Sequence, residues 1–377
     1  LHKKNFEISI ISGSYSHQFT KQPNGSKLIT SEKINNLNYY WVKTTKYTKP
    51  SSISRFINMI IFSLNLNSIF LIKINKPDII IVSTPSLFPI INALIFKLIY
   101  KSKIILDVRD LWPLTFIELN NFSKYHPLSI IFGLLEKISY TYADKVISTL
   151  NNSWKYMIKY GLKKENFLYT PIGFKNENKK IKIPKNNILL KIKNKKSIKI
   201  GYLGSITKSN NLTNLLEAAK YLQNDVKFIF IIIGDGAHKN YLEQKYKSLK
   251  NVYFLNKVNY EEVPFYLNEI DILYKGNLNK SIYKYGISPL KLAEYMYSEK
   301  IIIHATNIEN DPIKLSKAGF SIESDKPEKV VECIKQISKM SAQEKEVYQK
   351  NGKKYVLEHF NYEKISNSII DLINSMN

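Results

Sequence analysis

Short apolar runs alternate along most of the chain with amphipathic segments, and this alternation predicts an α/β protein. Two examples of the apolar runs are DIIIVST at residues 78–84 and VKFIFIII at residues 226–233. The runs are continuous rather than alternating between apolar and polar residues, which is typical of parallel sheets covered by helices on both faces. Ligands of such sheets bind beyond the carboxyl ends of the strands, so the turns that follow the strands are the first places to search for chemistry.

The predicted elements fall into two series. The predicted strands are residues 7–11, 39–42, 78–84, 103–108, 145–148, 167–170, 198–203, 226–233, 252–255, 270–274 and 300–304. The predicted helices are residues 54–74, 87–100, 127–142, 153–160, 212–222, 238–249, 260–267, 327–338, 342–359 and 362–375, with one more that begins near residue 288. Apart from the strand at 39–42, the polar stretch 12–46 is predicted to be a loop.

A change in composition marks the boundary between two domains. Residues 175–197 are rich in lysine and asparagine without an apolar period, as a linker is. We therefore predict domains at residues 1–174 and 198–360, followed by a terminal helix at 361–377. A doubly wound domain begins with a strand and a tight glycine turn, whereas residues 1–13 are predicted to be the end of a helix, a turn and then a strand. We expect the first strand and loop of this domain to lie outside the sequence.

The formal net charge of +25 favours an anionic partner. The positive charge is almost all lysine, since Arg55 and Arg109 are the only arginines, and no nucleic-acid-binding motif is present. We do not expect nucleic acid as a partner. The single cysteine, Cys333, excludes a disulfide framework, and the six histidines show no metal-ligand spacing.

Two helices of the first domain are unusually apolar. Residues 54–74 approach the length of a membrane span, but Asn58, Asn65 and Asn67 argue against a simple span. This helix and the one at 87–100 could lie on an anionic membrane surface, or they could be ordinary core helices.

The stretch GISPLKLAE at residues 286–294 is the strongest candidate site. Ser288 and Pro289 suit the start of a helix, where free N–H groups and the helix dipole favour an anion. Lys291 adds a cation and Glu294 a carboxylate one turn later, which suits a nucleotide diphosphate joined to a sugar. The alternative is a capped core helix whose Lys291 and Glu294 are solvated. Two other strand-end turns, at 204–208 and 234–236, are expected to converge on the same place.

These residues resemble those of the GT4 family of retaining glycosyltransferases. The similarity is carried by residues 202–219, 231–243 and 286–296 in the second half, and by LDVRDLWP at 106–113 and TPIGF at 170–174 in the first. The first half resembles a bacterial branch that builds O-antigen, capsule and related surface polysaccharide. The resemblance implies a GT-B fold, in which two Rossmann-like domains with parallel sheets face each other across a cleft. It also implies that the terminal helix crosses back to the first domain.

Site residues follow from the same resemblance. The donor-binding residues that it implies are Gly204, Ser205, Lys208, Gly234, Asp235, Ser288, Pro289, Leu290, Lys291 and Glu294. Glu294 would bind the ribose and Lys208 the diphosphate, and Asp110 of the DLWP motif is the candidate catalytic residue. No metal or other cofactor is implied. The sequence departs from the family at Gly286, where a first glutamate is usual, at Ser205, where arginine or asparagine is usual, and at residues 298–301.

The predicted activity is transfer of a hexose or N-acetylhexosamine, with retention, from a UDP-sugar to a lipid-linked sugar acceptor. The protein is expected in the cytoplasm, peripherally bound to the inner face of the plasma membrane. Two alternatives remain: a GT-B epimerase or hydrolase acting on a nucleotide sugar, and a non-catalytic binding protein of the same fold.

Overall fold

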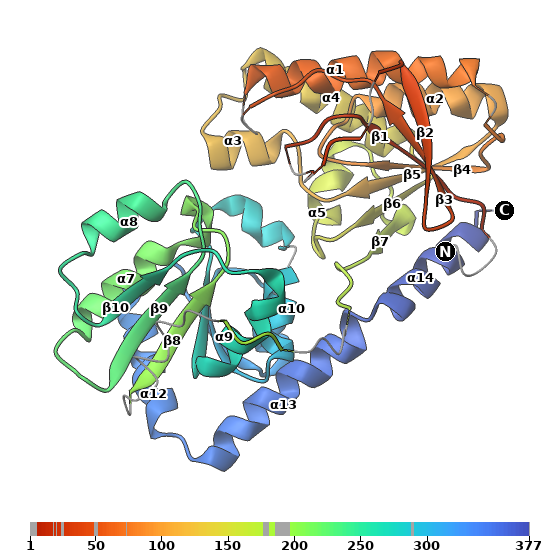
Figure 1. The fold of residues 1–377 in the computed structure, drawn as a ribbon. Coiled ribbons are helices and arrows are strands. Elements are labelled where there is room, and N and C mark those ends of the chain that lie inside the picture. Colours follow the sequence, from red (N-terminus) through yellow and green to blue (C-terminus); the bar gives the residue numbers. More distant parts are fainter. Residues whose placement is uncertain are drawn as a thin grey trace. The chain divides into compact units, whose positions relative to one another are not determined.

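The computed structural model describes residues 6–17, 19, 21–23, 26–48, 52–72, 74–175, 181–184, 197–287 and 290–376. It divides into two compact units, each an α/β assembly (Figure 1). Unit 1 comprises Leu1–Thr170 and Ser366–Asn377, and unit 2 comprises Pro171–Ile365. Most of the predicted linker lies outside the described residues.

Unit 2 is built on one parallel sheet whose strand order, over the described residues, is β10-β9-β8-β11-β12-β13. The strands are β8 Ile198–Leu203, β9 Phe228–Ile233, β10 Val252–Leu255, β11 Ile272–Gly276, β12 Ile301–Ala305 and β13 Gly319–Ile322. The α-helices are α7 Leu212–Tyr221, α8 Lys239–Lys245, α9 Val263–Glu269, α10 Leu290–Tyr297, α11 Pro312–Ser316, α12 Pro327–Lys339 and α13 Ala342–His359. Short 3-10 helices are η5 Lys208–Asn210, η6 Tyr260–Glu262 and η7 Ser281–Tyr285.

The central strands of unit 2 are apolar on both faces because both faces are covered. On β9, Phe228, Phe230 and Ile232 pack with helices α7 and α12 in one cluster. The intervening residues Ile229 and Ile231 pack with α9, α10 and α13 in another. Side chains of a strand alternate between faces, so a continuous apolar run buries residues on both sides.

Unit 1 contains two sheets, with strand orders β1-β3-β2 and β4-β5-β6-β7 among the described residues. The strands are β1 Ser9–Gly13, β2 Ile29–Ile34, β3 Leu37–Val42, β4 Ile79–Ser83, β5 Lys103–Val108, β6 Lys145–Ser148 and β7 Phe167–Tyr169. The α-helices are α1 Ile53–Leu66, α2 Pro89–Tyr100, α3 Leu114–Asn120, α4 Pro127–Tyr142 and α5 Trp154–Met157, with 3-10 helices η2 Asn67–Leu71, η3 Ile158–Tyr160 and η4 Lys164–Asn166. The second sheet is entirely parallel.

The first sheet corrects the prediction of a loop over most of residues 12–46, and it adds one antiparallel pair of strands to the otherwise parallel sheets. Strand β2 pairs with β3 in the antiparallel direction, through the two-residue turn Asn35-Asn36. Both turn residues have positive φ, 48° and 65°, as a tight hairpin requires. The sequence of β2 alternates weakly and three of its residues are exposed, which explains why its pattern looked like a loop. Helices α3 and α11 and strand β13 were also not predicted.

The predicted helix at residues 54–74 is α1 followed by the 3-10 helix η2. By length and composition alone, Ile53–Phe70 is apolar enough to cross a membrane. Two of its asparagines donate hydrogen bonds to the segment that follows β3. Asn58 donates to the carbonyl of Thr45, and Asn65 donates to the carbonyl of Lys43 over 2.8 Å.

The last helix, α14 (Tyr362–Asn374), begins in unit 2 and ends in unit 1. Near its start, the N–H of Phe174 donates to the carbonyl of Phe360 over 2.6 Å. Near its end, Ile373 is buried in a cluster with Ile105 of β5 and Ile147 of β6. The end of α14 thus contributes to the core of unit 1.

Candidate active site

The candidate site lies at the carboxyl edge of the sheet of unit 2, at the switch point of its topology. The chain adds strands β9 and β10 on one side of β8, and then returns to add β11 and β12 on the other side. At this switch point, the loop after β8 and the loop after β11 run to opposite sides of the sheet. Ligands of such sheets bind in the crevice between these loops. The turns after β8 and β9 and the start of α10 supply the candidate residues.

The turns after β8 and β9 pack backbone against backbone. Gly204 and Gly234 have φ values of 137° and 150°, which L side chains rarely adopt. A Cβ atom on Gly234 would lie 1.9 Å from the carbonyl oxygen of Gly204. The N–H of Ile206 also donates to the carbonyl of Asp235 over 2.8 Å. Glycine is therefore required at these turns to let the two loops touch.

Lys291 of α10 extends over the turn that follows β8. Its Nζ donates to the hydroxyl of Tyr202 over 2.6 Å and lies 4.3 Å from the centre of that ring. A Cβ atom on Gly204 would lie 2.3 Å from the same Nζ. Burial lowers the pKa of Lys291 to about 8, against the opposing charge of Glu294. The structure thus brings together a cation, Gly204 and Gly234 at one place.

Glu294 lies one helical turn beyond Lys291, and burial raises the pKa of its carboxyl against the opposing charge of Lys291. The next residue, Tyr295, holds the helix in place. Its hydroxyl donates to the carbonyl of Leu203 over 2.9 Å and accepts from the N–H of Leu203 over 2.7 Å. Both bonds are buried, so α10 is fixed against the end of β8 and the positions of Lys291 and Glu294 are fixed with it.

Other predicted donor-binding residues lie at the surface of the same edge. Ser205, Lys208 and Asp235 are exposed, and Leu290 is 45% exposed. The charge of Lys208 is one of the causes that lower the pKa of His238, after burial, so these two side chains are neighbours. Ser288 and Pro289 lie outside the described residues, and their role at the helix start stays a prediction.

The sequence pattern did not predict a second, partly buried lysine at this edge of the sheet. Lys275, in β11, donates to the carbonyl of Gly276 over 2.5 Å and to Oδ1 of Asn277 over 3.0 Å. Burial, and then the charge of Lys291, lower the pKa of Lys275 to about 7. The same Asn277 oxygen lies 3.2 Å from Nε2 of His304. A lysine at the end of a buried strand is the only sequence signal that could have pointed to this position.

The carboxyl edge of unit 2 therefore holds two cationic groups that are poorly hydrated. Because burial disfavours the charged lysines, a ligand carrying negative charge would relieve this cost and bind there preferentially. The described residues contain no group of three or more His, Cys, Asp or Glu residues that could hold a metal ion. The cationic side chains described at this edge include those of Lys208, Lys275 and Lys291.

The predicted catalytic residue, Asp110, belongs to unit 1. It follows β5, and its side chain is exposed. Desolvation by its surroundings nevertheless raises the pKa of its carboxyl, and the charge of Arg55 opposes this. The neighbouring Leu111 and Trp112 are buried, and the Trp112 ring packs on Phe132. Most of the DLWP motif is therefore core packing, and Asp110 is the part of it that reaches the surface.

The comparison with protein families identifies the chain. It belongs to the family of glycosyl transferases group 1, whose model matches residues 186–374. The match covers the switch-point site, including Lys275, Lys291 and Glu294. No curated protein matches the sequence significantly.

Solved structures of glycosyltransferases share the fold at low sequence identity. Sucrose-phosphate synthase from Thermosynechococcus elongatus superposes with a TM-score of 0.71 at 13% identity, over 100% of this chain and 90% of that one. HepE from Anabaena, in complex with UDP-glucose, gives 0.63 at 13% identity over 90% and 86%. WaaG, a glycosyltransferase involved in lipopolysaccharide biosynthesis, gives 0.63 at 11% identity over 97% and 91%. The chain therefore has the GT-B fold.

Proposed function

We propose that this glycosyltransferase moves a hexose or an N-acetylhexosamine from a UDP-sugar, with retention, onto a lipid-linked sugar, as GT4 enzymes of the surface-polysaccharide branch do. The observation that carries the proposal is the poorly hydrated Lys291 above Gly204, with Glu294 one turn away. A diphosphate fits the cation, and a ribose hydroxyl fits the carboxylate. The structure of HepE with UDP-glucose supports the choice of nucleotide.

In the proposed reaction, the acceptor oxygen forms a bond to the anomeric carbon of the sugar. The bond from that carbon to the β-phosphate oxygen breaks, and UDP leaves with the electron pair. The proton of the acceptor hydroxyl leaves to the departing phosphate or to water. Lys291 and Lys275 stabilise the charge that develops on the diphosphate. In this scheme the lysines neutralise the diphosphate without a metal, and Asp110 acts on the acceptor side.

The first test is binding of UDP, with GDP as a control, measured by calorimetry. We expect Glu294→Ala to weaken UDP binding by at least ~1 kcal/mol, because a hydrogen bond to a charged group is lost. Glu332→Ala is the matched control, since Glu332 is an exposed helical glutamate of the same unit. Equal losses of UDP affinity in both variants would show that Glu294 does not bind the nucleotide. Product analysis then separates transfer from epimerisation or hydrolysis, and binding without turnover would indicate a non-catalytic protein.

The affinity for UDP should fall at alkaline pH. The pKa values of Lys275 and Lys291 are about 7 and about 8, and a bound diphosphate favours their protonated forms. Binding should therefore take up protons, and raising the pH from about 7 to about 9.5 should weaken it at least ~tenfold. Calorimetry in buffers of different ionisation enthalpy measures the uptake. Lys291→Met should lose only the part of this pH dependence that Lys291 contributes, because Lys275 still titrates, and an unchanged slope in that variant would contradict the assignment.

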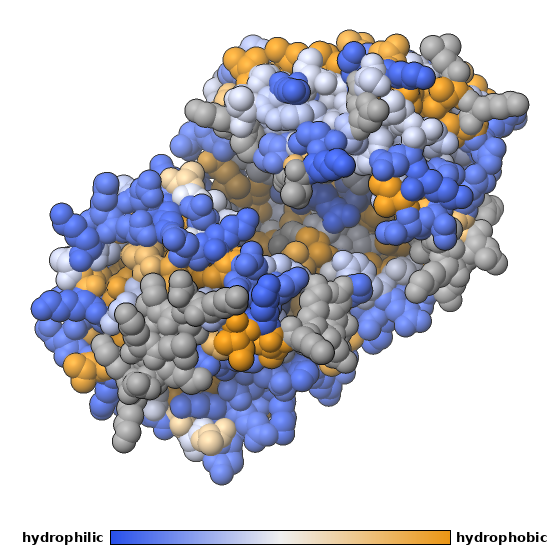
Figure 2. All heavy atoms as spheres, viewed as in Figure 1, coloured by the Kyte–Doolittle hydropathy of each residue, from blue (hydrophilic) through white to orange (hydrophobic). Residues whose placement is uncertain are grey.

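We further propose that unit 1 binds peripherally to the inner face of the plasma membrane. Exposed apolar residues recur at helical spacing on α1, α2 and α4, and hydrophobic atoms gather along α1 (Figure 2). The residues are Ile53, Ile57, Ile60 and Leu64 on α1, Ile91, Ile95, Leu98 and Ile99 on α2, and Ile130, Ile131 and Leu134 on α4. Lys101, Lys124 and Lys137 are exposed on or beside these helices and would attract anionic lipid.

The membrane proposal predicts the effect of charge on this face. Leu64 and Leu98 are 64% and 83% exposed, so Leu64→Glu combined with Leu98→Glu should leave the fold intact. Binding to vesicles of phosphatidylglycerol and phosphatidylethanolamine should fall at least ~tenfold, because two apolar insertions are lost. Leu315→Glu, at a 57% exposed leucine of unit 2, is the control. Equal vesicle binding by the double variant and the control in a flotation assay would overturn the proposal.

A further inference from the structure

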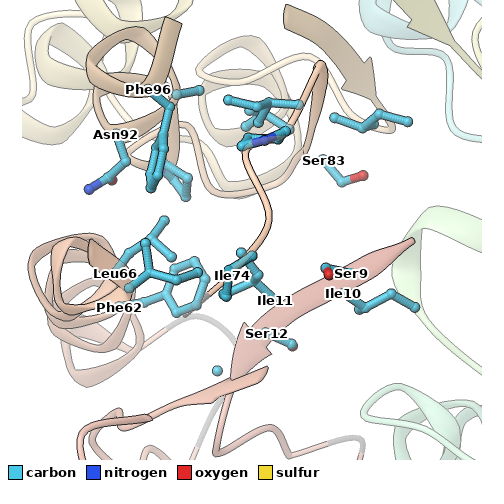
Figure 3. Close-up of a pocket in the computed structure, with 18 of the residues that line it drawn as sticks. Ser9, Ile10, Ile11, Ser12, Phe62, Leu66, Ile74, Ser83, Asn92 and Phe96 are labelled. Atoms are coloured by element: carbon cyan, nitrogen blue, oxygen red, sulfur yellow. The ribbon is translucent and has the colours of Figure 1, made fainter. Parts of the chain in front are cut away.

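Unit 1 contains a cavity of about 1200 Å³ that is lined by residues of β1, β4, α1 and α2 (Figure 3). Its lining is mainly apolar, and two polar side chains in it, Ser83 and Asn92, already have protein partners. The hydroxyl of Ser83 donates to Asp107 over 2.7 Å, and the amide of Asn92 donates to Asn67 over 2.8 Å. Unit 2 differs, because a row of polar side chains extends from its interior to the candidate site.

This polar row consists of Asp311, His304, Asn277 and Lys275, in this order. Nδ1 of His304 lies 2.7 Å from Oδ1 of Asp311, and both side chains are completely buried. Nε2 of His304 lies 3.2 Å from Oδ1 of Asn277, and the same oxygen accepts from Nζ of Lys275 over 3.0 Å. The polar row thus joins a carboxyl group in the interior to a lysine of the candidate site.

The strand pairing of the sheet brings Lys275 and His304 together. They are partners in the register of the parallel strands β11 and β12, so their side chains project from the same face. Asn277 follows β11, and its N–H donates to the carbonyl of Ala305 over 2.9 Å. Its own carbonyl accepts from the amide of Asn211 over 3.1 Å. The backbone of Asn277 is therefore held on two sides, which fixes where its side chain lies.

The partners of His304 determine where its ring hydrogens lie. Oδ1 of Asn277 is an amide oxygen without a hydrogen, so Nε2 of His304 is the donor in that contact. Burial raises the pKa of the Asp311 carboxyl, but the charge of His304 and the hydrogen bonds made to this carboxyl outweigh burial and lower the pKa. Asp311 is thus a carboxylate that accepts from Nδ1. His304 therefore donates in both directions.

The Nε2 hydrogen of His304 selects one orientation of the Asn277 amide. If the amide were rotated by half a turn, its NH₂ group would face Nε2–H and the ammonium of Lys275, which are both donors. The observed orientation places the amide oxygen between the two donors, and this oxygen has two lone pairs to accept both. The orientation that holds Lys275 thus depends on His304, and the orientation of His304 depends on Asp311.

We propose that Asp311 and His304 are positioning residues for sugar transfer, which act through Asn277 to hold the ammonium of Lys275 toward the donor diphosphate. This inference rests on the proposed function, because the diphosphate of a UDP-sugar is taken as the ligand of the carboxyl edge. Asp311 and His304 are completely buried, so they affect the ligand through the polar row and not by contact. A rotated amide would remove one of the two acceptors that the structure describes for Lys275.

The alternative is a purely structural role for His304 as the partner of Asp311. Oδ1 of Asp311 also accepts from the N–H of Ile313 over 3.2 Å and so caps the start of α11. In that case the contribution of His304 would depend on its Nδ1 contact, whereas the positioning role depends on its Nε2 contact. Substitutions that keep one contact and remove the other therefore separate the two roles.

His304→Gln and His304→Asn form such a pair. The amide nitrogen of glutamine can occupy the place of Nε2 and keep a donor toward Asn277, while the amide nitrogen of asparagine can occupy the place of Nδ1 and keep a donor toward Asp311. We expect His304→Asn to weaken UDP binding at least ~tenfold in calorimetry, because the support of a charged group is lost. His304→Gln should stay within about threefold of the unmodified protein, although its thermal midpoint should fall. With a saturating UDP-sugar, the loss in His304→Asn should also appear in kcat.

Two further variants complete the comparison. Lys275→Met should weaken UDP binding at least as much as His304→Asn. Asn251→Ser removes a buried hydrogen bond to the carbonyl of Ala219, outside the polar row, and controls for destabilisation. Equal UDP binding by the two His304 variants, or a larger loss in His304→Gln, would overturn this inference alone. Absence of UDP binding by the unmodified protein would overturn the proposed function and this inference with it.

A measurement on the unmodified protein covers the case in which a His304 variant does not fold. Nitrogen-15 NMR of the histidine rings, at the pH of the binding assay, reports which ring nitrogens carry hydrogen. His304 is completely buried, so its ring hydrogens should exchange slowly and identify its signals. We expect hydrogen on Nε2 as well as on Nδ1, and an Nε2 without hydrogen would overturn the proposed contact with Asn277.

Discussion

Replacing Lys291 with methionine should reduce the rate of sugar transfer by about a hundredfold to a thousandfold, while the fold is retained. Loss of one charge-stabilising group from a preorganised site has effects of this size. The Nζ of Lys291 lies over the Tyr202 ring and is poorly hydrated, so methionine can fill the same space without a buried charge. The free energy of unfolding should stay the same or rise slightly, because the penalty for burying the cation is removed.

Steady-state kinetics with a saturating UDP-sugar donor measures this prediction. The loss should fall mainly on kcat, since the charge on the diphosphate grows as the glycosidic bond of the donor breaks. Lys220→Met is the matched control, because Lys220 is an exposed lysine of α7 in the same unit. A Lys291→Met enzyme with a kcat within about threefold of the unmodified enzyme would show that Lys291 does not act on the leaving group.

Gly234→Ala should destabilise unit 2 and leave the stability of unit 1 unchanged. The new Cβ atom would lie 1.9 Å from the Gly204 carbonyl oxygen, and the residue would be held at a φ of 150°. We expect the free energy of unfolding of unit 2 to fall by at least ~2 kcal/mol, because the backbone of two touching loops must move. The same movement would displace Gly204 from beneath Lys291, so UDP binding should weaken as well.

The position of the tryptophans allows the two units to be followed separately. Trp41, Trp112 and Trp154 all belong to unit 1, so tryptophan fluorescence reports its unfolding, whereas circular dichroism reports both units. Gly234→Ala should shift the urea midpoint seen by circular dichroism but not the one seen by fluorescence. Gly133→Ala, in helix α4 with only Pro113 at 4.0 Å from the new atom, should instead stabilise unit 1 by ~0.5–1 kcal/mol. Parallel shifts of both midpoints in Gly234→Ala would contradict the local explanation.

The parts of the fold that could be predicted are those set by local pattern. The strand at 228–233 and the turn after it were predictable because a run of six apolar residues ends in Gly234-Asp235-Gly236. The start of α14 was predictable for a different local reason, because Asn361, a residue type that caps helix N-termini, directly precedes it and accepts from the N–H of Glu363. Strand β2 was missed because its exposed residues carry little pattern, although Asn35-Asn36 is a recognisable turn signal.

The candidate site was predictable only in part. Lys291 and Glu294 follow a helix-start pattern, so the sequence indicated them. Lys275 is one lysine among many, and its partial burial depends on how α10 and β12 pack beside β11, which no local pattern records. The DLWP motif, by contrast, is easily recognised in the sequence, but most of it is structural. Leu111 and Trp112 are core residues, and Asp110 is the exposed residue of the motif.

The path of the chain has a consequence for how the protein is made. Unit 2 is continuous over Pro171–Ile365, whereas unit 1 needs Ile373 from the end of α14 to complete its core. During translation, the residues that close unit 1 leave the ribosome only after all of unit 2 has been synthesised. Domains usually fold in the order of synthesis, from the N-terminus. Of the two units, the one that is translated first is the last that can finish folding, and a nascent chain must carry it unfinished until α14 emerges.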